Sequence, residues 1–264
     1  MKSQLSQLHR SSHRRRKTAL LWALVLAFWA SSLQSDARVP GEMEAPGTPG
    51  VVEYVFTYSE VSVTGPWQTA ASAVRHTVLS RVRAAAGQLF GIWRPTQLPD
   101  GALFDRLAPD ELVIVVAWPD EDSADKPEWL DAELRALEHV TSASTRLYEP
   151  TVLPTTTELR AGRGFYVHRF NKYEADDVER VIRLSVEAWK SFEPTFGAQV
   201  VGLFRQRPDV DGIAQMVRIV WYADYPAWLE SRHAERAPDA FAKFRERLEL
   251  QLDGAGIAAD LVEP

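Results

Sequence analysis

The side chains most able to carry chemistry in this chain lie in its second half. His168 stands in a predicted strand in which Tyr166 and Phe170 share its face by alternation. An imidazole in that place can bind a ligand or transfer a proton near neutral pH. Arg205 and Arg218 also stand inside predicted strands, where a charge is costly unless it is paired or faces a wet cavity. These residue types indicate a pocket for an anionic or carbonyl-bearing molecule.

We expect an apolar lumen whose polar points are Arg218, His168 and Tyr166. The alternative for the arginines is an ion pair with a carboxylate such as Glu53, and the alternative for the histidine is a structural role. The candidate ligand-binding residues are His168, Arg218, Tyr166, Arg205 and Tyr54.

The usual catalytic signatures are absent from the sequence. The chain has no cysteine, which excludes disulfides, thiolate nucleophiles and cysteine-based zinc sites. It has no phosphate-binding Walker loop, no GxSxG elbow and no HExxH motif. Asp120, Asp122 and Asp125 form an acidic loop, but the glycine and final glutamate of an EF-hand are missing from their positions. No catalytic residue, metal site or cofactor is therefore predicted.

The amino terminus has the pattern of an export signal. A basic stretch ends at Lys17, residues 18–33 are apolar and uncharged, and small residues follow up to Ala37. Residues 1–37 are interpreted as a signal peptide cleaved after Ser32 or Ala37, or as an uncleaved membrane anchor formed by residues 18–33. The expected location is periplasmic or secreted, or anchored in the membrane. Residues 38–50 are rich in Pro and Gly and are a linker.

Charge and composition describe an ordinary globular body. Of the 264 residues, 45% are hydrophobic and 25% charged, and the net charge is −6. Because the export segment is basic, the body is more acidic than this total. An acidic body without a basic face argues against nucleic acid as a partner.

The body reads as two copies of one pattern. The first copy has strand candidates at 51–61, 89–93, 111–118 and 144–153, helices beginning at Trp67 and Pro127, and a loop or hairpin extension at 94–109. The second has strands at 165–170, 200–205, 215–222 and 257–262 and helices at 176–196 and 240–252. Pro194 falls in the last turn of the first of these helices, which predicts a kink or an early end.

Three short matches relate the two copies in the same order. LFGIWR matches VGLFR around Gly202, VVAWPD matches IVWYAD, and PEWLDAE matches PAWLESR. The matches make Trp118 equivalent to Trp221 and Trp129 equivalent to Trp228. We therefore predict an α+β fold of two tandem ferredoxin-like βαββαβ units, 51–155 and 160–264, which pair their sheets into an α+β barrel.

The second copy resembles a known family. Its GFYVHRF, QVVGLFR and MVRIVWYADYPAWLE segments are similar to the NIPSNAP group of the dimeric α+β barrel superfamily. The resemblance covers residues 160–260 well and 50–155 poorly. It implies two ferredoxin-like units that form a barrel, here within one chain, so a monomer with an internal pseudo-dimer or a homodimer is expected.

The functional prediction is an exported, NIPSNAP-like barrel that binds a small apolar or aromatic molecule in its lumen. The first alternative is an enzyme, because some relatives in this superfamily oxidise planar aromatic substrates or degrade haem without a separate organic cofactor. Haem is the one cofactor that this enzymatic alternative implies, and no sequence motif supports haem binding. The second alternative is a membrane-tethered structural or interaction protein.

Overall fold

The computed structural model describes residues 54–100, 102, 105–119 and 125–262. The predicted export segment, the linker and Glu53 lie outside the described residues, as do Asp120 and Asp122. Among the helices that are described, none combines the length and apolar character needed to cross a membrane.

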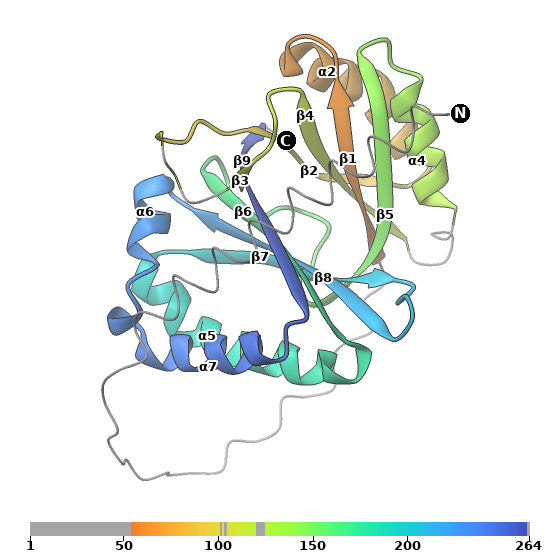
Figure 1. Cartoon of the computed structure of the whole chain (residues 1–264). Helices are drawn as coiled ribbons and strands as arrows, with labels where there is room; N and C mark the ends of the chain where they lie inside the picture. The colour runs from red at the N-terminus through yellow and green to blue at the C-terminus, as the bar shows by residue number, and fades with distance from the viewer. Residues whose placement is uncertain (1–53, 101, 103–104, 120–124, 263–264) are drawn as a thin grey trace, which may run out of the picture.

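The described strands close into a barrel covered by helices on its outside (Figure 1). Neighbouring strands follow the order β2-β4-β1-β5-β7-β8-β6-β9, all antiparallel, and β9 pairs back onto β2. This is the predicted α+β barrel of two ferredoxin-like units. Each unit has the same internal order, because β2-β4-β1-β5 in the first corresponds to β7-β8-β6-β9 in the second.

The first unit packs its helices over the outer face of its own four strands. Its elements are β1 (Tyr54–Val63), α2 (Trp67–Ala73), a π-helical turn (Val74–Val78), α3 (Leu79–Ala84), β2 (Gln88–Pro95), β4 (Glu111–Pro119), α4 (Lys126–Arg135) and β5 (Val140–Leu153). The predicted extension at 94–109 contains a short strand, β3 (Asp105–Arg106), which pairs in parallel with β9 of the other unit.

The second unit follows the same plan with more helix. Its elements are β6 (Phe165–Glu174), a 3-10 turn (Ala175–Asp177), α5 (Val178–Phe196), β7 (Gln199–Arg207), β8 (Ile213–Tyr222), α6 (Tyr225–Glu230), a 3-10 turn (Ala234–Arg236), α7 (Pro238–Glu249) and β9 (Asp253–Val262). Helices α5 and α7 lie side by side along the outside of this sheet (Figure 1).

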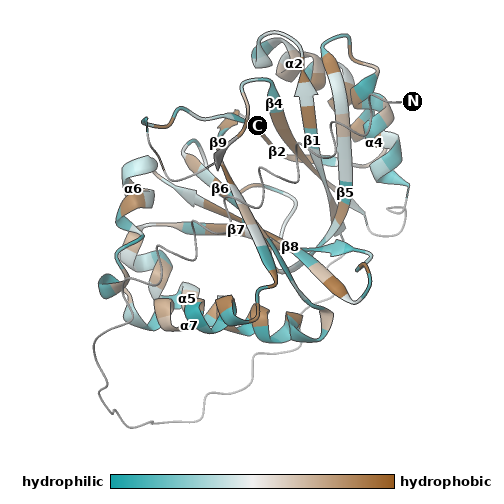
Figure 2. Cartoon of the chain, viewed as in Figure 1, coloured by the Kyte–Doolittle hydropathy of each residue, from teal (hydrophilic) through white to brown (hydrophobic). Residues whose placement is uncertain are grey.

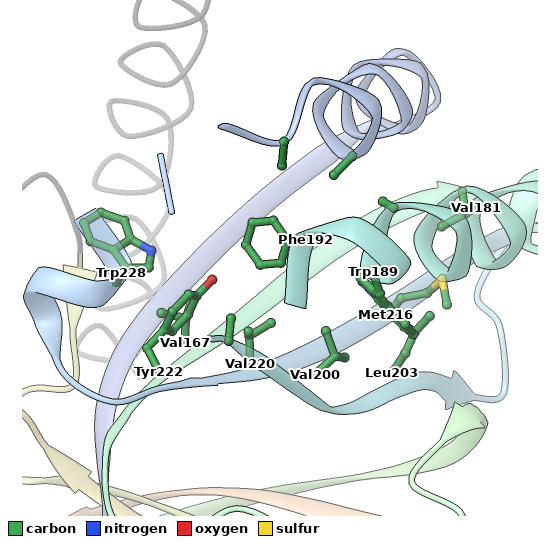
Figure 3. Close-up of a cluster of buried hydrophobic side chains, with 14 of the residues drawn as sticks. Val167, Val181, Trp189, Phe192, Val200, Leu203, Met216, Val220, Tyr222 and Trp228 are labelled. Atoms are coloured by element: carbon green, nitrogen blue, oxygen red, sulfur yellow. The ribbon is translucent and has the colours of Figure 1, made fainter. Parts of the chain in front are cut away.

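Three hydrophobic cores follow from the alternation of side chains along the strands. Two lie between a sheet and its helices, and the third fills the barrel. In the second unit, Val181, Trp189 and Phe192 of α5 point toward Val200 and Met216 of the sheet (Figure 3). Figure 2 shows the corresponding pattern, with brown along the strands and teal on the outward surfaces of α4, α5 and α7.

Helix α5 runs past Pro194 to Phe196, so of the two outcomes predicted for Pro194, a kink or an early end, the early end is wrong. A proline near the end of a helix is tolerated when its ring meets no further obstruction and only one backbone bond is lost. The helix stops instead at Gly197, whose φ of 60° is left-handed. Glycine adopts this conformation without a Cβ clash.

Replacing Gly197 by Ala is expected to lower the free energy of unfolding by about 1 kcal/mol, because an L-residue is strained at positive φ. Gly162→Ala is the matched control, since a Cβ there meets nothing within 4 Å and the backbone is not left-handed. Urea unfolding of both variants measures the difference. Equal effects at the two glycines would contradict this account of the helix end.

The structure also corrects one equivalence between the two units. Trp118 lies on the outer face of β4, where its ring packs against Trp129 at a centroid distance of 5.7 Å. Trp221 belongs to the inward face of β8 and packs against the barrel core. The pairing of Trp118 with Trp221 is therefore wrong by one residue, and Tyr222, which lies on the outer face, is the structural counterpart of Trp118.

Candidate functional site

The interior of the barrel is an aromatic core to which both units contribute. The buried rings are Phe56, Tyr58, Phe90, Trp93, Tyr148, Tyr166 and Phe204. Phe56 contacts Phe90 and Phe204 edge to face, with ring centroids 5.2 and 5.1 Å apart. These contacts fill the lumen with side chains, so any ligand there must take the place of a ring.

Two glycines at equivalent places let these rings lie against the strands. Gly91 and Gly202 stand at the register shifts of β2 against β4 and of β7 against β8. A Cβ on Gly91 would lie 2.5 Å from the ring of Trp93, and one on Gly202 would lie 2.1 Å from the ring of Phe204. The aromatic packing of the lumen therefore requires glycine at both bulges.

His168 is the polar centre of this core. It is 0% exposed, and its Nδ1 lies 2.8 Å from the hydroxyl of Tyr58, which comes from the other unit. Burial lowers the pKa of His168 to about 3, so the ring is neutral at physiological pH. Burial, together with the negative charge of Glu60, raises the pKa of Tyr58 well above its ordinary value and keeps the phenol protonated.

Two ring nitrogens in this core have no hydrogen-bond partner among the residues that the structure describes. They are Nε2 of His168 and Nε1 of Trp93, both buried, on rings whose centroids lie 4.8 Å apart. If Tyr58 donates to Nδ1, then Nε2 carries the proton and is the one polar atom of the pair left unsatisfied. The opposite tautomer leaves both Nε2 and the Tyr58 proton unsatisfied. The first tautomer is therefore favoured, and it gives two unsatisfied N–H donors on neighbouring rings.

A line of polar side chains leads from His168 to one end of the barrel. The hydroxyl of Tyr148 accepts a bond of 3.3 Å from Nε2 of Gln215, and the rings of Tyr148 and Tyr58 have centroids 6.1 Å apart. Beyond them, half-buried Arg146 and Glu60 form an ion pair of 3.2 Å. Half-buried Phe170 packs against Tyr58 from the same end, with centroids 5.5 Å apart. The side chains at this end of the barrel are therefore more polar and less buried than those around His168.

The connection between the two units covers the other end of the barrel. Leu159 and Ala161 of this connection pack against the barrel core. The hydroxyl of Tyr166 donates to the carbonyl oxygens of Ala161 and Gly162, at 3.0 and 2.7 Å. The predicted placement of Tyr166 in the lumen is correct, but its hydroxyl is already bonded to backbone.

The remaining candidates lie away from His168. Tyr54 is half-buried at the rim of the core and donates to the carbonyl of Thr155 at 3.0 Å. Arg205 forms an ion pair with Asp209 near the surface. This agrees with the alternative that the arginine pairs with a carboxylate, although the carboxylate named in the prediction was Glu53.

The expectation that Arg218 faces the lumen is wrong. Arg218 pairs in register with Arg169, while Ile219 pairs with His168. Because neighbouring residues of a strand point to opposite faces, Ile219 points inward and Arg218 points outward, toward the helices of the second unit. The structure therefore separates Arg218 from His168 by the thickness of the sheet.

The sequence did not single out Tyr58, Trp93 or Tyr148 as site residues. Trp93 is fully buried, and its unsatisfied N–H has no signature in the sequence. Tyr58 lies 110 residues from His168, so their contact depends on closure of the barrel.

A groove of about 760 Å³ lies outside the barrel, beside the seam between β2 and β9. Its walls include Arg75, Arg163 and Arg94, and Arg94 forms an ion pair of 3.1 Å with Asp260 and lies 5.1 Å over the ring of Trp67. Sequence reasoning missed this groove because both units supply its walls.

The other three described histidines do not join the lumen. His76 and His139 line a separate hollow of about 580 Å³ beside α2, and exposed His233 lies 3.0 Å from Glu235. Within the described residues, no three His, Asp or Glu side chains come together in a way that would hold a metal ion.

The surroundings of His168 do not fit a haem. A haem iron bound at Nε2 needs a flat cavity beside that atom. The buried rings of Trp93 and Tyr58 stand edge to face with the imidazole, at centroid distances of 4.8 and 5.8 Å. Moving either ring aside to admit a macrocycle would break the close packing of the core.

Comparison with known proteins supports the fold. No protein-family model and no curated protein matches the sequence. Among solved structures, the chain is similar to a candidate monooxygenase from Lactobacillus acidophilus with a TM-score of 0.51 and 11% identity, over 80% of this chain and 93% of that one. This likeness shows a shared α+β barrel fold, not a shared activity.

Two weaker matches have TM-scores below 0.5. A mutant chlorite dismutase from Candidatus Nitrospira defluvii has a TM-score of 0.48 and 13% identity, over 80% of this chain and 92% of that one. A candidate monooxygenase from Fusobacterium nucleatum has a TM-score of 0.45 and 9% identity, over 81% and 93%.

Proposed function

We propose that the barrel binds a small planar aromatic molecule that carries an oxygen acceptor, and that this oxygen accepts hydrogen bonds from Nε2 of His168 and Nε1 of Trp93. The observation that carries the proposal is the pair of buried, unsatisfied N–H groups within an aromatic core. Buried donors without partners cost free energy, which an oxygen acceptor would recover. The aromatic body of the ligand would replace part of the packing now made by rings at the Phe170 end.

Binding is favoured over general-base catalysis by the electrostatics of the site. A histidine whose pKa lies at about 3 is a weak base at neutral pH. In this proposal the neutral imidazole of His168 donates a hydrogen bond to the ligand, as does the indole of Trp93.

The proposal is tested with a pair of probes that differ by one carbonyl, α-tetralone and tetralin. The full chain is expected to bind the ketone about tenfold more tightly than the hydrocarbon, because one hydrogen bond to a buried donor contributes about 1.4 kcal/mol. Isothermal calorimetry measures both. Equal affinities, or no binding of either probe, would overturn the proposal.

Variants locate the site. Trp93→Phe removes the indole N–H but keeps a ring, and His168→Phe does the same for the imidazole. Each is expected to reduce the preference for the ketone. Trp221→Phe is the matched control, because that indole already donates to the carbonyl of Arg163 at 3.1 Å. A preference for the ketone that survives both lumen variants would place the ligand elsewhere.

The enzymatic alternative is cofactor-independent oxygenation of an aromatic substrate. One observation favours it: two neutral donors in a water-poor core would stabilise negative charge on a bound phenol or enol oxygen, and such an anion is the species that reacts with O₂. An oxygen electrode with 1-naphthol as substrate tests it. Oxygen uptake that is lost in Trp93→Phe supports catalysis. Uptake no greater than in buffer alone contradicts catalysis and agrees with a binding function.

The family, cellular location and oligomeric state of the chain are the subject of a separate proposal. We propose a NIPSNAP-like barrel of two units, 51–155 and 160–264, that is exported or membrane-anchored by residues 1–37. Because the barrel closes within one chain, it does not need a second copy for closure, and it is a monomer with an internal pseudo-dimer or a homodimer. Sequencing of the mature amino terminus tests the export signal. A new terminus at residue 33 or 38 supports cleavage, whereas an intact Met1 in the membrane fraction supports the anchor.

A further inference from the structure

The groove beside the seam between β2 and β9 has the dimensions of a small-molecule site. Its volume is about 760 Å³, and ligand pockets in proteins commonly have this size and lie where two structural units meet. The first unit supplies Trp67, Arg75 and Arg94 to the walls, and the second supplies Arg163 and Tyr225. The groove is therefore complete only when the barrel is closed.

Arg94 is a fixed hydrogen-bond donor on the wall of this groove. Its Nη1 donates to the carbonyl oxygen of Pro95 at 3.1 Å, and its Nη2 lies 3.1 Å from Oδ2 of Asp260, its partner across the seam. The guanidinium also lies 5.1 Å over the ring of Trp67. An arginine has more N–H donors than these two polar contacts use, so Arg94 can keep both partners and still donate to a ligand. Because these contacts already order the side chain, little of its entropy is lost on binding.

The helical wall of the groove has an unusual backbone. Arg75 lies in the π-helical turn Val74–Val78, which separates α2 from α3. Turns of this kind are rare and frequently occur at functional sites. The turn is a property of the backbone, so it points to the groove independently of the side chains that line it.

The charged side chains of the groove indicate the charge of its ligand. Among the described lining residues they are three arginines and two aspartates: Arg75, Arg94, Arg163, Asp224 and Asp260. Both carboxylates also have protein donors, because Asp260 accepts from the hydroxyl of Thr96 at 2.7 Å and Asp224 accepts from the backbone N–H of Ala227 at 2.7 Å. An excess of one positive charge suits a monoanion such as a carboxylate better than a dianion such as a phosphate monoester.

Aromatic rings form the apolar part of the groove. Trp67 and Tyr225 are both half-buried, so part of each ring remains exposed. Tyr225 is held by stacking on Trp228, with centroids 5.4 Å apart, and by an edge-to-face contact with Phe165 at 5.6 Å. Indole, phenol and guanidinium groups all pack well against a planar aromatic ring. The walls therefore match an aromatic body as well as an anionic group.

We propose that this groove binds a small aromatic carboxylate. Arg75, Arg94 and Arg163 supply the hydrogen bonds and positive charge for the carboxylate, and Trp67 and Tyr225 supply contacts for the ring. The site is independent of the ligand proposed for the lumen, because the groove lies outside the barrel and includes neither His168 nor Trp93.

Three probes test the ligand class by calorimetry with the full chain: 2-naphthoate, the neutral 2-naphthamide, and decalin-2-carboxylate, whose rings are saturated. 2-Naphthoate is expected to bind about tenfold more tightly than the amide, because charge-assisted hydrogen bonds are stronger than neutral ones. It is expected to bind about threefold more tightly than the saturated acid, because only the planar rings stack. Added salt is expected to weaken binding of 2-naphthoate and not of the amide.

The same titrations with Trp93→Phe separate the groove from the lumen. Binding of 2-naphthoate is expected to be the same in Trp93→Phe as in the wild type, and its loss there would place the anion in the lumen and overturn the proposal. In Trp93→Phe, no binding of 2-naphthoate, or an affinity equal to that of the amide or of the saturated acid, would also overturn it. Failure of the lumen proposal alone changes none of these results.

Substitutions of the arginines locate the carboxylate. Arg75→Gln is expected to weaken binding of 2-naphthoate about tenfold. Arg163→Gln is expected to weaken it about threefold, because Arg163 is exposed and water screens its charge. Arg75→Lys keeps the charge and is expected to retain part of the affinity. None of these variants is expected to change binding of 2-naphthamide, which a general loss of structure would weaken.

Arg83→Gln is the matched control for these variants. Arg83 is exposed on α3, which follows the π-helical turn, and it is not a lining residue of the groove. Its substitution removes the same charge and is expected to leave binding of 2-naphthoate unchanged. Because Arg163 is exposed, Arg163→Gln gives a result even if Arg75→Gln does not fold. Wild-type affinity in Arg163→Gln and in every folded Arg75 variant would overturn the proposal, as would an equal loss in Arg83→Gln.

Discussion

Lowering the pH from about 6.5 to about 4 is expected to remove about 3 kcal/mol from the free energy of unfolding through His168 alone. The folded-state pKa of this histidine is about 3, below the ordinary value of about 6.5 that it regains on unfolding. At a pH between these two values, the histidine of the unfolded chain is protonated and that of the folded chain is not. The stabilisation is complete above about pH 6.5 and is lost as the pH falls toward the folded-state pKa.

Denaturant unfolding at several pH values measures this effect as a difference between proteins. Carboxylates also titrate in this range, so the wild type is compared with His168→Gln, which lacks the buried imidazole. The pH dependence of the variant is expected to be shallower between pH 6.5 and 4. His76→Gln, at an exposed position, is the control and is expected to follow the wild type. Parallel curves for the wild type and His168→Gln would show that the imidazole is not buried in a neutral state.

Trp93→Ala is expected to lower the free energy of unfolding by about 3 to 5 kcal/mol, the largest loss for a single substitution in the barrel core. Trp93 is 0% exposed and packs against Phe90, Tyr166 and His168, at centroid distances of 6.5, 5.6 and 4.8 Å. Removing it leaves a cavity that rigid strands on all sides cannot close. Urea unfolding monitored by far-ultraviolet circular dichroism measures the loss.

Trp67→Ala provides the comparison for this substitution. Trp67 is half-buried at the start of α2 and covers Arg94, so it has solvent on one side. Its loss is expected to be well below that of Trp93, because water can fill the space left behind. A similar loss at both tryptophans would show that the barrel core collapses around the missing ring.

The elements of this fold could be predicted from the sequence because most of them carry a local pattern. Alternation correctly placed Tyr166, His168 and Phe170 on one inward face of β6, since residues two apart on a strand share a face. Amphipathic spacing located α5, with Val178, Trp189 and Phe192 buried. These assignments need no knowledge of which strands are neighbours.

The side of the sheet on which Arg218 lies could not be predicted in the same way. Strand β8 is buried on both faces, with Val217 and Ile219 inward and Met216 and Val220 outward. An apolar run on both sides has no polar face to indicate which side meets solvent. The pairing with Arg169 decides the question, and that register is a property of the folded sheet.

The site around His168 was harder still, because it is assembled across the two units. Tyr58 and Trp93 come from the first unit and His168 from the second, and their contacts exist only when the barrel is closed. A local pattern indicates that each residue is buried, but not that it meets the others.

Closure of the barrel by one chain also has a consequence for symmetry. Two identical subunits that form such a barrel present every inward side chain twice, at positions related by a twofold axis. Here the seams β5–β7 and β9–β2 join two unlike halves, so each inward position exists once. The hydrogen bond between Tyr58 and His168 has no symmetry mate, and the interior can distinguish the two ends of a bound molecule.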